Sequence, residues 1–272
     1  MVVFPNAKIN IGLNILSKRE DGYHNLQTVF AVIALKDALE IIEAEPRTEG
    51  VKFTSSGLYV QGAVEGNLCV KAYQLLKQDF PALPAVHMHL HKTIPMGAGL
   101  GGGSSDAAFA LQLINQKFSL HLSSQQLINY AVQLGSDCAF FILNKPCYAT
   151  GRGEILEPIE LDLSNFGILL INPGIHISTS LAFSNINIGE HPQDLRLLLA
   201  NDIKTWKHSI VNDFEKPVFA AYPEIEQIKA TLYDQGALYA SMSGSGSSVY
   251  GIFPKEKIPA LNFPEHYLQR WF

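Results

Sequence analysis

The chain has 272 residues and 47% hydrophobic residues, a composition typical of a folded globular protein. Its formal net charge is −5, and it lacks the clusters of Lys and Arg that a nucleic-acid binder carries. Its three cysteines, Cys69, Cys138 and Cys147, form no C-x-x-C pair, so we expect reduced thiols rather than disulfides or a zinc site. No apolar run approaches the roughly 18 residues of a membrane helix, and the N-terminus has no basic signal-peptide region, so we expect a cytoplasmic protein that acts on a small molecule and binds neither a membrane nor a nucleic acid.

The first elements of the chain read as a β-hairpin. Residues 7–16 alternate in polarity, with apolar side chains on one face and Lys8 and Asn10 side by side on the other. Asp21-Gly22 is a strong turn signal, so residues 23–34 are expected to return as the second strand. The pattern therefore predicts a half-buried strand that presents a lysine beside an asparagine.

The rest of the chain mixes further strands and helices irregularly, which indicates an α+β protein. Asn67 is a good N-cap residue and Gly135 a good C-cap residue, so helices are expected to start and stop there. A turn at residues 151–153 suggests a boundary between a first domain, 1–150, and a second domain, 151–272. The other expected elements are strands over 38–43, 86–92, 167–171, 237–240 and 249–253 and helices over 68–78, 104–116, 124–134, 193–200 and 224–235.

Between Pro95 and Ala108 the sequence PMGAGLGGGSSDAA carries five glycines, and each glycine has a backbone-entropy cost in a fixed structure. Without Cβ atoms, successive N–H groups can turn toward an anion, and the following helix adds its unpaired N–H groups and its dipole. The loop joins a patterned strand to a helix, so a flexible linker is the poorer interpretation. The pattern predicts a site for a polyphosphate.

Three common phosphate motifs do not fit this loop. A Walker A motif needs a lysine after the last glycine, where Ser104 stands instead. A dinucleotide-binding loop needs an acidic residue about 20 positions on, and none lies between Asp106 and Asp137. The His-Arg-Asp and Asp-Phe-Gly signatures of protein kinases do not occur.

The whole loop resembles the second motif of the GHMP kinases, a family named for galactokinase, homoserine kinase, mevalonate kinase and phosphomevalonate kinase. Residues 5–10, PNAKIN, look like the first motif of that family, and residues 242–249, MSGSGSSV, look like the third. The three motifs occur in the family's order and span nearly the whole chain. The resemblance implies a ribosomal protein S5 domain 2-like N-terminal domain that binds ATP, a ferredoxin-like α/β-sandwich C-terminal domain, and an active site in the cleft between them.

By the same resemblance, the cofactors are ATP and Mg²⁺. No metal ligand can be assigned from the sequence, and it carries no signal for an oligomeric state. Asn67 is expected either to touch the adenine side of ATP or only to cap its helix, and the sequence favours neither. The residues expected to hold ATP are Pro95, Met96, Gly97, Ala98, Gly99, Leu100, Gly101, Gly102, Gly103, Ser104, Ser105 and Asn67.

Within the family, residues 7–10 and the segment DGYHNL at 21–26 look like the branch that phosphorylates the 2-hydroxyl of 4-diphosphocytidyl-2-C-methyl-D-erythritol, in the methylerythritol phosphate route to isoprenoid precursors. An aromatic face can stack on a pyrimidine and an imidazole can bond to its edge. The resemblance therefore implies a small substrate that bears a cytidine diphosphate group. The residues expected to bind it are Tyr23, His24, Phe183, Asn10 and Thr179.

Phosphoryl transfer needs positioning, charge stabilisation and a carboxylate that accepts the hydroxyl proton. Asp137 is the candidate base, and Lys8 would keep it ionised and neutralise charge on the moving phosphoryl group. From the residue pattern alone, a helix-capping aspartate and an exposed strand lysine are the commoner situations, and the resemblance reverses that preference. Many relatives carry Val-Pro after this aspartate, whereas Cys138-Ala139 follows here.

Two further polar features have simpler interpretations. Asp106 is expected to complement the dipole of its helix rather than to place Mg²⁺ through water. His87, His89 and His91 share one strand face, which we interpret as solvated, because no carboxylate or cysteine completes a metal-ligand set.

Other functions remain open from sequence. Another kinase of the same fold, of the homoserine or mevalonate class, would not need Tyr23-His24. A catalytically silent ligand sensor would not need Lys8 together with Asp137. A nicotinamide oxidoreductase is the weakest alternative, because the ribose-binding carboxylate is missing.

Overall fold

The structure is a computed structural model that describes residues 1–45, 48–178, 182–183, 186, 188, 193–257 and 259–272. Its contacts divide the chain into two compact units whose segments interleave. The first unit comprises residues 1–7, 34–96 and 101–145, and the second comprises residues 8–33, 97–100 and 146–272. Compactness alone does not test where a family domain begins, so the boundary expected near residue 150 stays a prediction.

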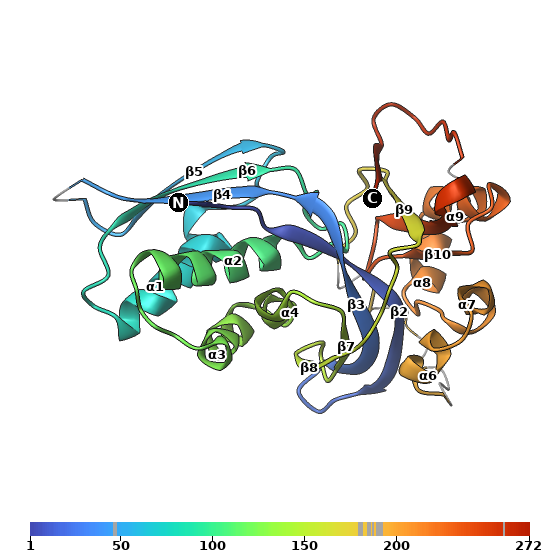
Figure 1. The fold of residues 1–272 in the computed structure, drawn as a ribbon, viewed down its shortest axis with the longest axis horizontal. Helices are drawn as coiled ribbons and strands as arrows, with labels where there is room; N and C mark the ends of the chain where they lie inside the picture. The colour runs from blue at the N-terminus through green and yellow to red at the C-terminus, as the bar shows by residue number, and fades with distance from the viewer. Residues whose placement is uncertain (46–47, 179–181, 184–185, 187, 189–192, 258) are drawn as a thin grey trace. The chain divides into compact units, whose positions relative to one another are not determined.

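The first unit is a four-stranded sheet with helices on one face (Figure 1). The strand order is β1 (Val2–Val3), β4 (Ala38–Glu43), β6 (Val86–Lys92) and β5 (Val51–Gly57), and only the β5–β6 pair is parallel. Alternate side chains of β4 and β6, such as Ile41 and Met88, are buried. The helices are α1 (Leu68–Asp79), α2 (Gly102–Lys117), α3 (Ser124–Leu134) and α4 (Cys138–Leu143), preceded by the 3₁₀ turn η1 (Val64–Gly66).

Local capping signals fix the helix ends of this unit. The Oδ1 atom of Asn67 accepts a hydrogen bond from the Cys69 N–H at 2.9 Å, as its N-cap role requires. Ser123 and Gln126 form a capping box at the start of α3, and Gly135 occupies its C-cap position. The expected caps at Asn67 and Gly135 are confirmed, while α2 begins two residues earlier than expected, at Gly102.

Two further four-stranded sheets belong mainly to the second unit. One has the order β2 (Asn6–Lys18), β3 (His24–Lys36), β7 (Cys147–Thr150) and β8 (Ile155–Pro158), and the ends of β2 and β3 extend into the first unit. The other is antiparallel, with the order β10 (Tyr239–Met242), β11 (Val249–Pro254), β9 (Phe166–Asn172) and β12 (Leu268–Trp271). The helices are α6 (Leu195–Leu199), α7 (Ile203–Ser209), α8 (Glu215–Ala221) and α9 (Pro223–Asp234), and a 3₁₀ turn η2 (Lys255–Lys257) follows β11.

The mixture of sheets and helices confirms the expected α+β class. Helix α9 packs on β10 and β11, and its buried Ile225, Ile228 and Leu232 join the apolar core of the second unit. Among the described residues, no helix is both long and apolar enough to cross a bilayer.

Candidate active site

The glycine loop leads from β6 to α2 in backbone conformations that suit glycine. Gly97, Gly99 and Gly101 have φ values of 63°, 76° and 69°. At Gly99 a Cβ atom would lie 1.8 Å from the carbonyl oxygen of Ser243, so no other residue fits there. Ser104 and Ser105 lie in the first turn of α2. The N-terminus of α2 presents backbone N–H groups of the kind that can bind an anion.

Parts of all three sequence motifs meet in the second unit. The Ser243 hydroxyl donates to the Gly99 carbonyl at 2.8 Å and accepts from the Asn10 N–H at 3.2 Å. The Lys8 N–H donates to the Leu100 carbonyl at 3.0 Å, and the Ser248 N–H donates to the Ala98 carbonyl at 3.2 Å. The first glycines of the loop are therefore fixed by the segments that carry the other two motifs.

Two buried asparagines, which the sequence reasoning missed, support the third motif. The Nδ2 group of Asn212 donates to the carbonyls of Met242 and Gly244, each at 2.8 Å, and its Oδ1 accepts from the Phe214 N–H at 3.0 Å. Asn172 likewise donates to the hydroxyls of Ser247 and Ser248, at 3.2 and 3.1 Å. Neither asparagine stands in a motif, so no local signal marks them.

Lys8 is buried, which contradicts its alternative interpretation as an exposed strand lysine. Its Nζ donates to Asn10 Oδ1 at 2.5 Å and lies 5.0 Å from the ring centre of Phe30. The Asn10 amide in turn donates to the Thr28 hydroxyl at 2.9 Å. Lysine and asparagine thus interact directly, as their shared strand face predicted.

Asp137 occupies the N-cap position of α4, but its side chain makes no capping hydrogen bond there. The interpretation of this residue as a helix-capping carboxylate is therefore wrong. Asp137 belongs to the first unit and Lys8 to the second, so their joint action stays a prediction.

The hairpin residues expected to bind a pyrimidine lie in the second unit. Tyr23 is 57% exposed, and the guanidinium of Arg152 lies 4.9 Å from its ring centre. The His24 ring stacks on Phe183, with centres 4.9 Å apart and an angle of 21° between the planes, while Phe183 packs edge-on against Phe214. Thr179 lies outside the described residues. Stacking partners are therefore present, although Phe183 pairs with His24 here.

The first unit buries an ionic cluster that sequence reasoning missed, formed by Asp37, Lys92 and Asp106. The Lys92 ammonium is bonded to Asp37 Oδ2 and, at 2.8 Å, to Asp106 Oδ2. Asp106 therefore belongs to an internal ion cluster and does not simply complement the dipole of α2. One local signal existed: Lys92 falls in the same register as the buried Met88 and Leu90, and a lysine at an inward position needs a buried partner.

The pKa values of Asp106 and Lys92 are both raised in this cluster. Burial raises the pKa of Asp106 to about 7; Lys92 opposes the shift and the charge of Asp37 adds to it. Burial alone would lower the pKa of Lys92, but the attraction of Asp106 and Asp37 outweighs it and raises that pKa above its ordinary value. The cluster thus holds a firmly cationic lysine beside a carboxyl group that titrates near neutral pH.

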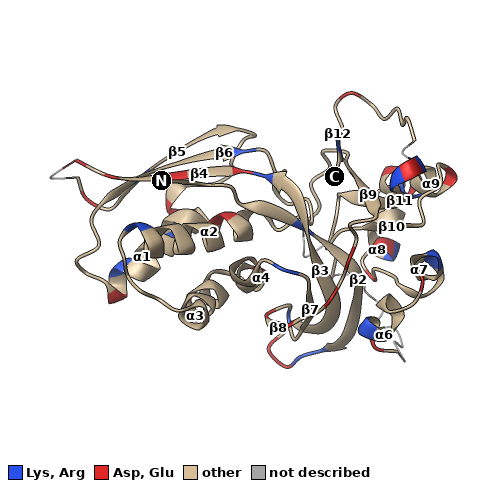
Figure 2. Ribbon diagram, viewed as in Figure 1, with Lys and Arg blue, Asp and Glu red and all other residues tan. Residues whose placement is uncertain are grey.

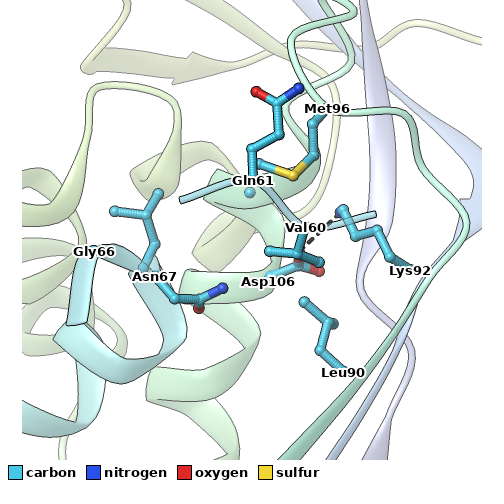
Figure 3. Close-up of a pocket in the computed structure, with 10 residues that line it drawn as sticks. Val60, Gln61, Gly66, Asn67, Leu90, Lys92, Met96 and Asp106 are labelled. Carbon is cyan, nitrogen blue, oxygen red and sulfur yellow. Dashed lines mark hydrogen bonds and ion pairs between the residues drawn. The ribbon is translucent and has the colours of Figure 1, made fainter. Parts of the chain in front are cut away.

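A small pocket of about 110 Å³ opens beside this cluster, as Figure 3 shows. The amide of Asn67 points into it, so this residue combines its capping bond with a place on the pocket wall. Met96 and Gly103 bring the glycine loop to the same pocket. The lining residues are Val60, Gln61, Gly66, Asn67, Leu68, Leu90, Lys92, Met96, Gly103 and Asp106.

The histidines of β6 lie on the outward face of the sheet. His89 exchanges hydrogen bonds with Thr54 and Ser56 of β5, at 2.9 Å each, and His91 with Ser56 at 3.0 Å. Their partners are hydroxyl groups of the neighbouring strand, whereas His87 Nε2 lies 3.3 Å from a carboxylate oxygen of Glu45. These partners fit a polar sheet face.

Comparison with known proteins matches residues 67–145 to the GHMP kinases N terminal domain and residues 194–261 to the GHMP kinases C terminal domain. A Bacteroides fragilis protein named 4-diphosphocytidyl-2-C-methyl-D-erythritol kinase is 52% identical over 264 residues, which cover 97% of this chain and 96% of that protein. A Porphyromonas gingivalis protein of the same name is 42% identical and covers 93% and 92% of the two chains.

Solved structures agree with these relatives. A crystal structure of 4-(cytidine 5'-diphospho)-2C-methyl-D-erythritol kinase superposes with a TM-score of 0.78 at 32% identity, covering 93% of this chain and 90% of that one. The Methanococcus jannaschii mevalonate kinase gives a TM-score of 0.71 at 12% identity over 94% and 92% of the chains, which supports the fold alone.

Proposed function

Because the chain belongs to the GHMP kinase family, we propose that it transfers the γ-phosphoryl group of ATP to the 2-hydroxyl of 4-diphosphocytidyl-2-C-methyl-D-erythritol. One observation carries the proposal: relatives named for this activity match the chain over nearly its whole length. We assign the reaction to the methylerythritol phosphate route, and the protein to the cytoplasm, on the same basis.

The ATP side of the reaction is assigned to the glycine loop, from Pro95 to Ser105. Backbone N–H groups and the N-terminus of α2 suit the phosphates, since they offer positive dipoles without a side-chain cation. The pocket lined by Asn67 and Met96 adjoins the loop and has the apolar walls that a purine base requires. Phosphates and base would then both bind to backbone and apolar surfaces of the first unit and its glycine loop.

For the chemical step, we assign Asp137 as the general base and Lys8 as the cation. Asp137 would accept the proton of the attacking hydroxyl, and Lys8 would stabilise negative charge as it develops. The bond from Lys8 to Asn10 holds the ammonium at the start of its strand, so this cation does not have to be ordered when the substrate binds.

Mg²⁺ enters the proposal as part of MgATP, where it would neutralise charge on the phosphates. Among the residues that the structure describes, no three side chains of His, Cys, Asp or Glu could hold a metal ion. We therefore assign no residue of the chain to the metal and leave most of its coordination to phosphate oxygens.

On the acceptor side, we assign Tyr23, His24 and Phe183 to the cytosine ring and Asn10 and Thr179 to polar groups of the substrate. The exposed ring of Tyr23 is free to stack on a pyrimidine on the side away from Arg152. His24 would leave Phe183 when cytosine arrives, because a base cannot occupy the space in which their rings are stacked.

The test is to incubate the purified protein with ATP, Mg²⁺ and candidate alcohols and to follow ADP release. We expect release that depends on 4-diphosphocytidyl-2-C-methyl-D-erythritol. Release with homoserine or mevalonate alone would contradict the proposed substrate but support the kinase activity. No release with any alcohol, despite nucleotide binding, would favour a ligand sensor of the same fold.

A further inference from the structure

The first unit buries two carboxyl groups against one lysine, and their surroundings differ. Asp37 accepts three hydrogen bonds, from Lys92 and from the N–H groups of Thr93 and Ile94 at 2.6 and 2.9 Å. Asp106 accepts one, from Lys92, and its Oδ1 is buried without a hydrogen-bond partner among the described residues. Because hydrogen bonds to the charged form stabilise a carboxylate, Asp106 has little support of this kind for its charge.

Asp106 also faces the pocket that adjoins the glycine loop (Figure 3). Helix α2 carries no charged residue besides Asp106 and the C-terminal Lys117 (Figure 2). The pocket, at about 110 Å³, is several times the roughly 30 Å³ that one water occupies, so it has room for a planar group. Such a group would pack between Leu68, Leu90 and Met96, beside the buried carboxyl group.

We propose that binding of a purine nucleotide in this pocket is coupled to the uptake of one proton by Asp106. The inference rests on the proposed function, since it takes the glycine loop as the site of the ATP phosphates. Phosphates at the N-terminus of α2 bring negative charge toward the carboxylate, and a buried site screens that charge poorly, so the bound nucleotide disfavours ionisation of Asp106. The proton comes from solvent and is held on Oδ1, because Oδ2 accepts from Lys92.

Near neutral pH, Asp106 is the group of this cluster that changes charge. Burial raises its pKa to about 7, whereas Lys92 on β6 stays cationic because its two carboxyl neighbours raise its pKa. The thiols of Cys69 on α1 and Cys138 on α4 stay neutral, because burial raises the pKa of both.

The other packed elements add no competing group. On β4, Glu40 and Glu43 are exposed, and β1 contains only valines. The single titratable residue of α3, Tyr130, is bonded to the exposed Asp79. Within the first unit, the proton taken up on nucleotide binding is therefore assigned to Asp106. The ring of His176 lies beside Gly97 of the glycine loop, in the second unit, and the comparison with Asp106→Asn separates its contribution from that of Asp106.

The experiment is a calorimetric titration of the full chain with ADP between pH 6 and 9, in pairs of buffers with different ionisation enthalpies. If the nucleotide raises the pKa of Asp106 by one unit, linkage predicts an affinity that falls about eightfold across this range and an uptake of about half a proton at pH 7.5. Asp106→Asn, whose side chain is neutral throughout, removes this part of the pH dependence. The titration of the ADP phosphates is common to both proteins and cancels.

Asp79→Asn makes the same chemical change at an exposed aspartate of the same unit and is expected to behave as the parent. Equal pH profiles for the parent and Asp106→Asn, or proton release by the parent, would overturn the inference. Proton uptake by the parent, corrected for the ionisation of free ADP, gives a second measurement that does not depend on the folding of a variant. ADP that binds without proton uptake, in a protein that still turns over the cytidyl substrate, would refute only this inference; a folded protein that binds no ADP would refute the proposed function as well.

Discussion

The two compact units support their glycine segments by opposite means. In the first unit, the start of α2 lies against the charged cluster of Asp37, Lys92 and Asp106, and a Cβ atom at Gly102 would lie 2.9 Å from the Lys92 ammonium. In the second unit, neutral amides and hydroxyls hold the third motif, chiefly through Asn212 and Ser243. Both supports are buried, but only one of them changes its charge with pH.

The difference shows what each unit can contribute to regulation. A buried ion cluster is sensitive to the loss of one partner and to protonation, because an uncompensated charge in a low-dielectric site is costly. A neutral hydrogen-bond network fixes geometry at every pH, and its loss costs only the bonds that are left unmade. We therefore expect pH to act on nucleotide binding through the first unit and to leave the third motif unchanged.

Asp137→Asn tests the chemical step, which involves neither the charged cluster of the first unit nor the neutral hydrogen-bond network of the second. Asp137 makes no capping hydrogen bond to α4, and asparagine has nearly the same size and shape, so the change removes the proposed base without deleting a helix cap. We expect kcat to fall roughly 10²–10⁴-fold, about 3–5 kcal/mol, with little change in ADP affinity. Steady-state kinetics and ADP titration measure the two effects. Turnover equal to that of the parent would exclude Asp137 as the base.

Lys92→Met tests the charged support directly. The change removes the only cation bonded to Asp37 and Asp106 among the described residues and leaves two buried carboxyl groups facing each other. We expect the free energy of unfolding in urea at pH 8 to fall by about 3–5 kcal/mol. Adding Asp106→Asn to this variant should restore part of the loss, since one of the two unpaired charges is gone. A loss below about 1 kcal/mol would mean that the cluster contributes little to stability.

Much of the fold was predictable because its signals are local. Strands β4 and β6 and helix α3 have the predicted bounds, since alternation, helical periodicity and caps act within a few residues. The glycine loop was found the same way. The elements that sequence missed include α4, β7, β8 and β12, each of four to six residues, too short to show a period, and fixed by their neighbours.

The supporting residues of the site were harder to predict because their partners are remote in sequence. Asp37 and Lys92 are 55 residues apart, and Asn212 reaches carbonyls 30 and 32 residues away. Only the inward register of Lys92 hinted at a buried partner. The motifs contain the groups that could contact the substrate, whereas the contacts that hold those groups in place depend on the tertiary fold.

Asn212→Ala tests the neutral support. It leaves the Met242 and Gly244 carbonyls and the Phe214 N–H without their partner, so we expect a loss of about 1–3 kcal/mol in unfolding free energy, equal at pH 6 and pH 8. Asn212→Asp keeps the acceptor for Phe214 but turns an ionisable group toward two carbonyls, so its destabilisation should grow with pH. Urea unfolding at both pH values measures each variant. A pH-dependent loss in the alanine variant would show that the two units do not differ in the way described.

Asp106→Asn is expected to have the smallest and most specific effect, which is on the unfolding free energy of the protein without ligand. A carboxyl group whose pKa is raised on folding, here to about 7, stabilises the native state below its unfolded pKa, and that stabilisation is lost as pH rises through 7. The parent should therefore lose about 1 kcal/mol relative to Asp106→Asn between pH 6 and pH 7, and little more above pH 8. Urea unfolding across this range measures the difference, and the exposed Asp79→Asn should run parallel to the parent. If the curves of parent and Asp106→Asn are parallel too, the first unit is no more sensitive to pH than the second, and the contrast between charged and neutral support has no consequence for stability.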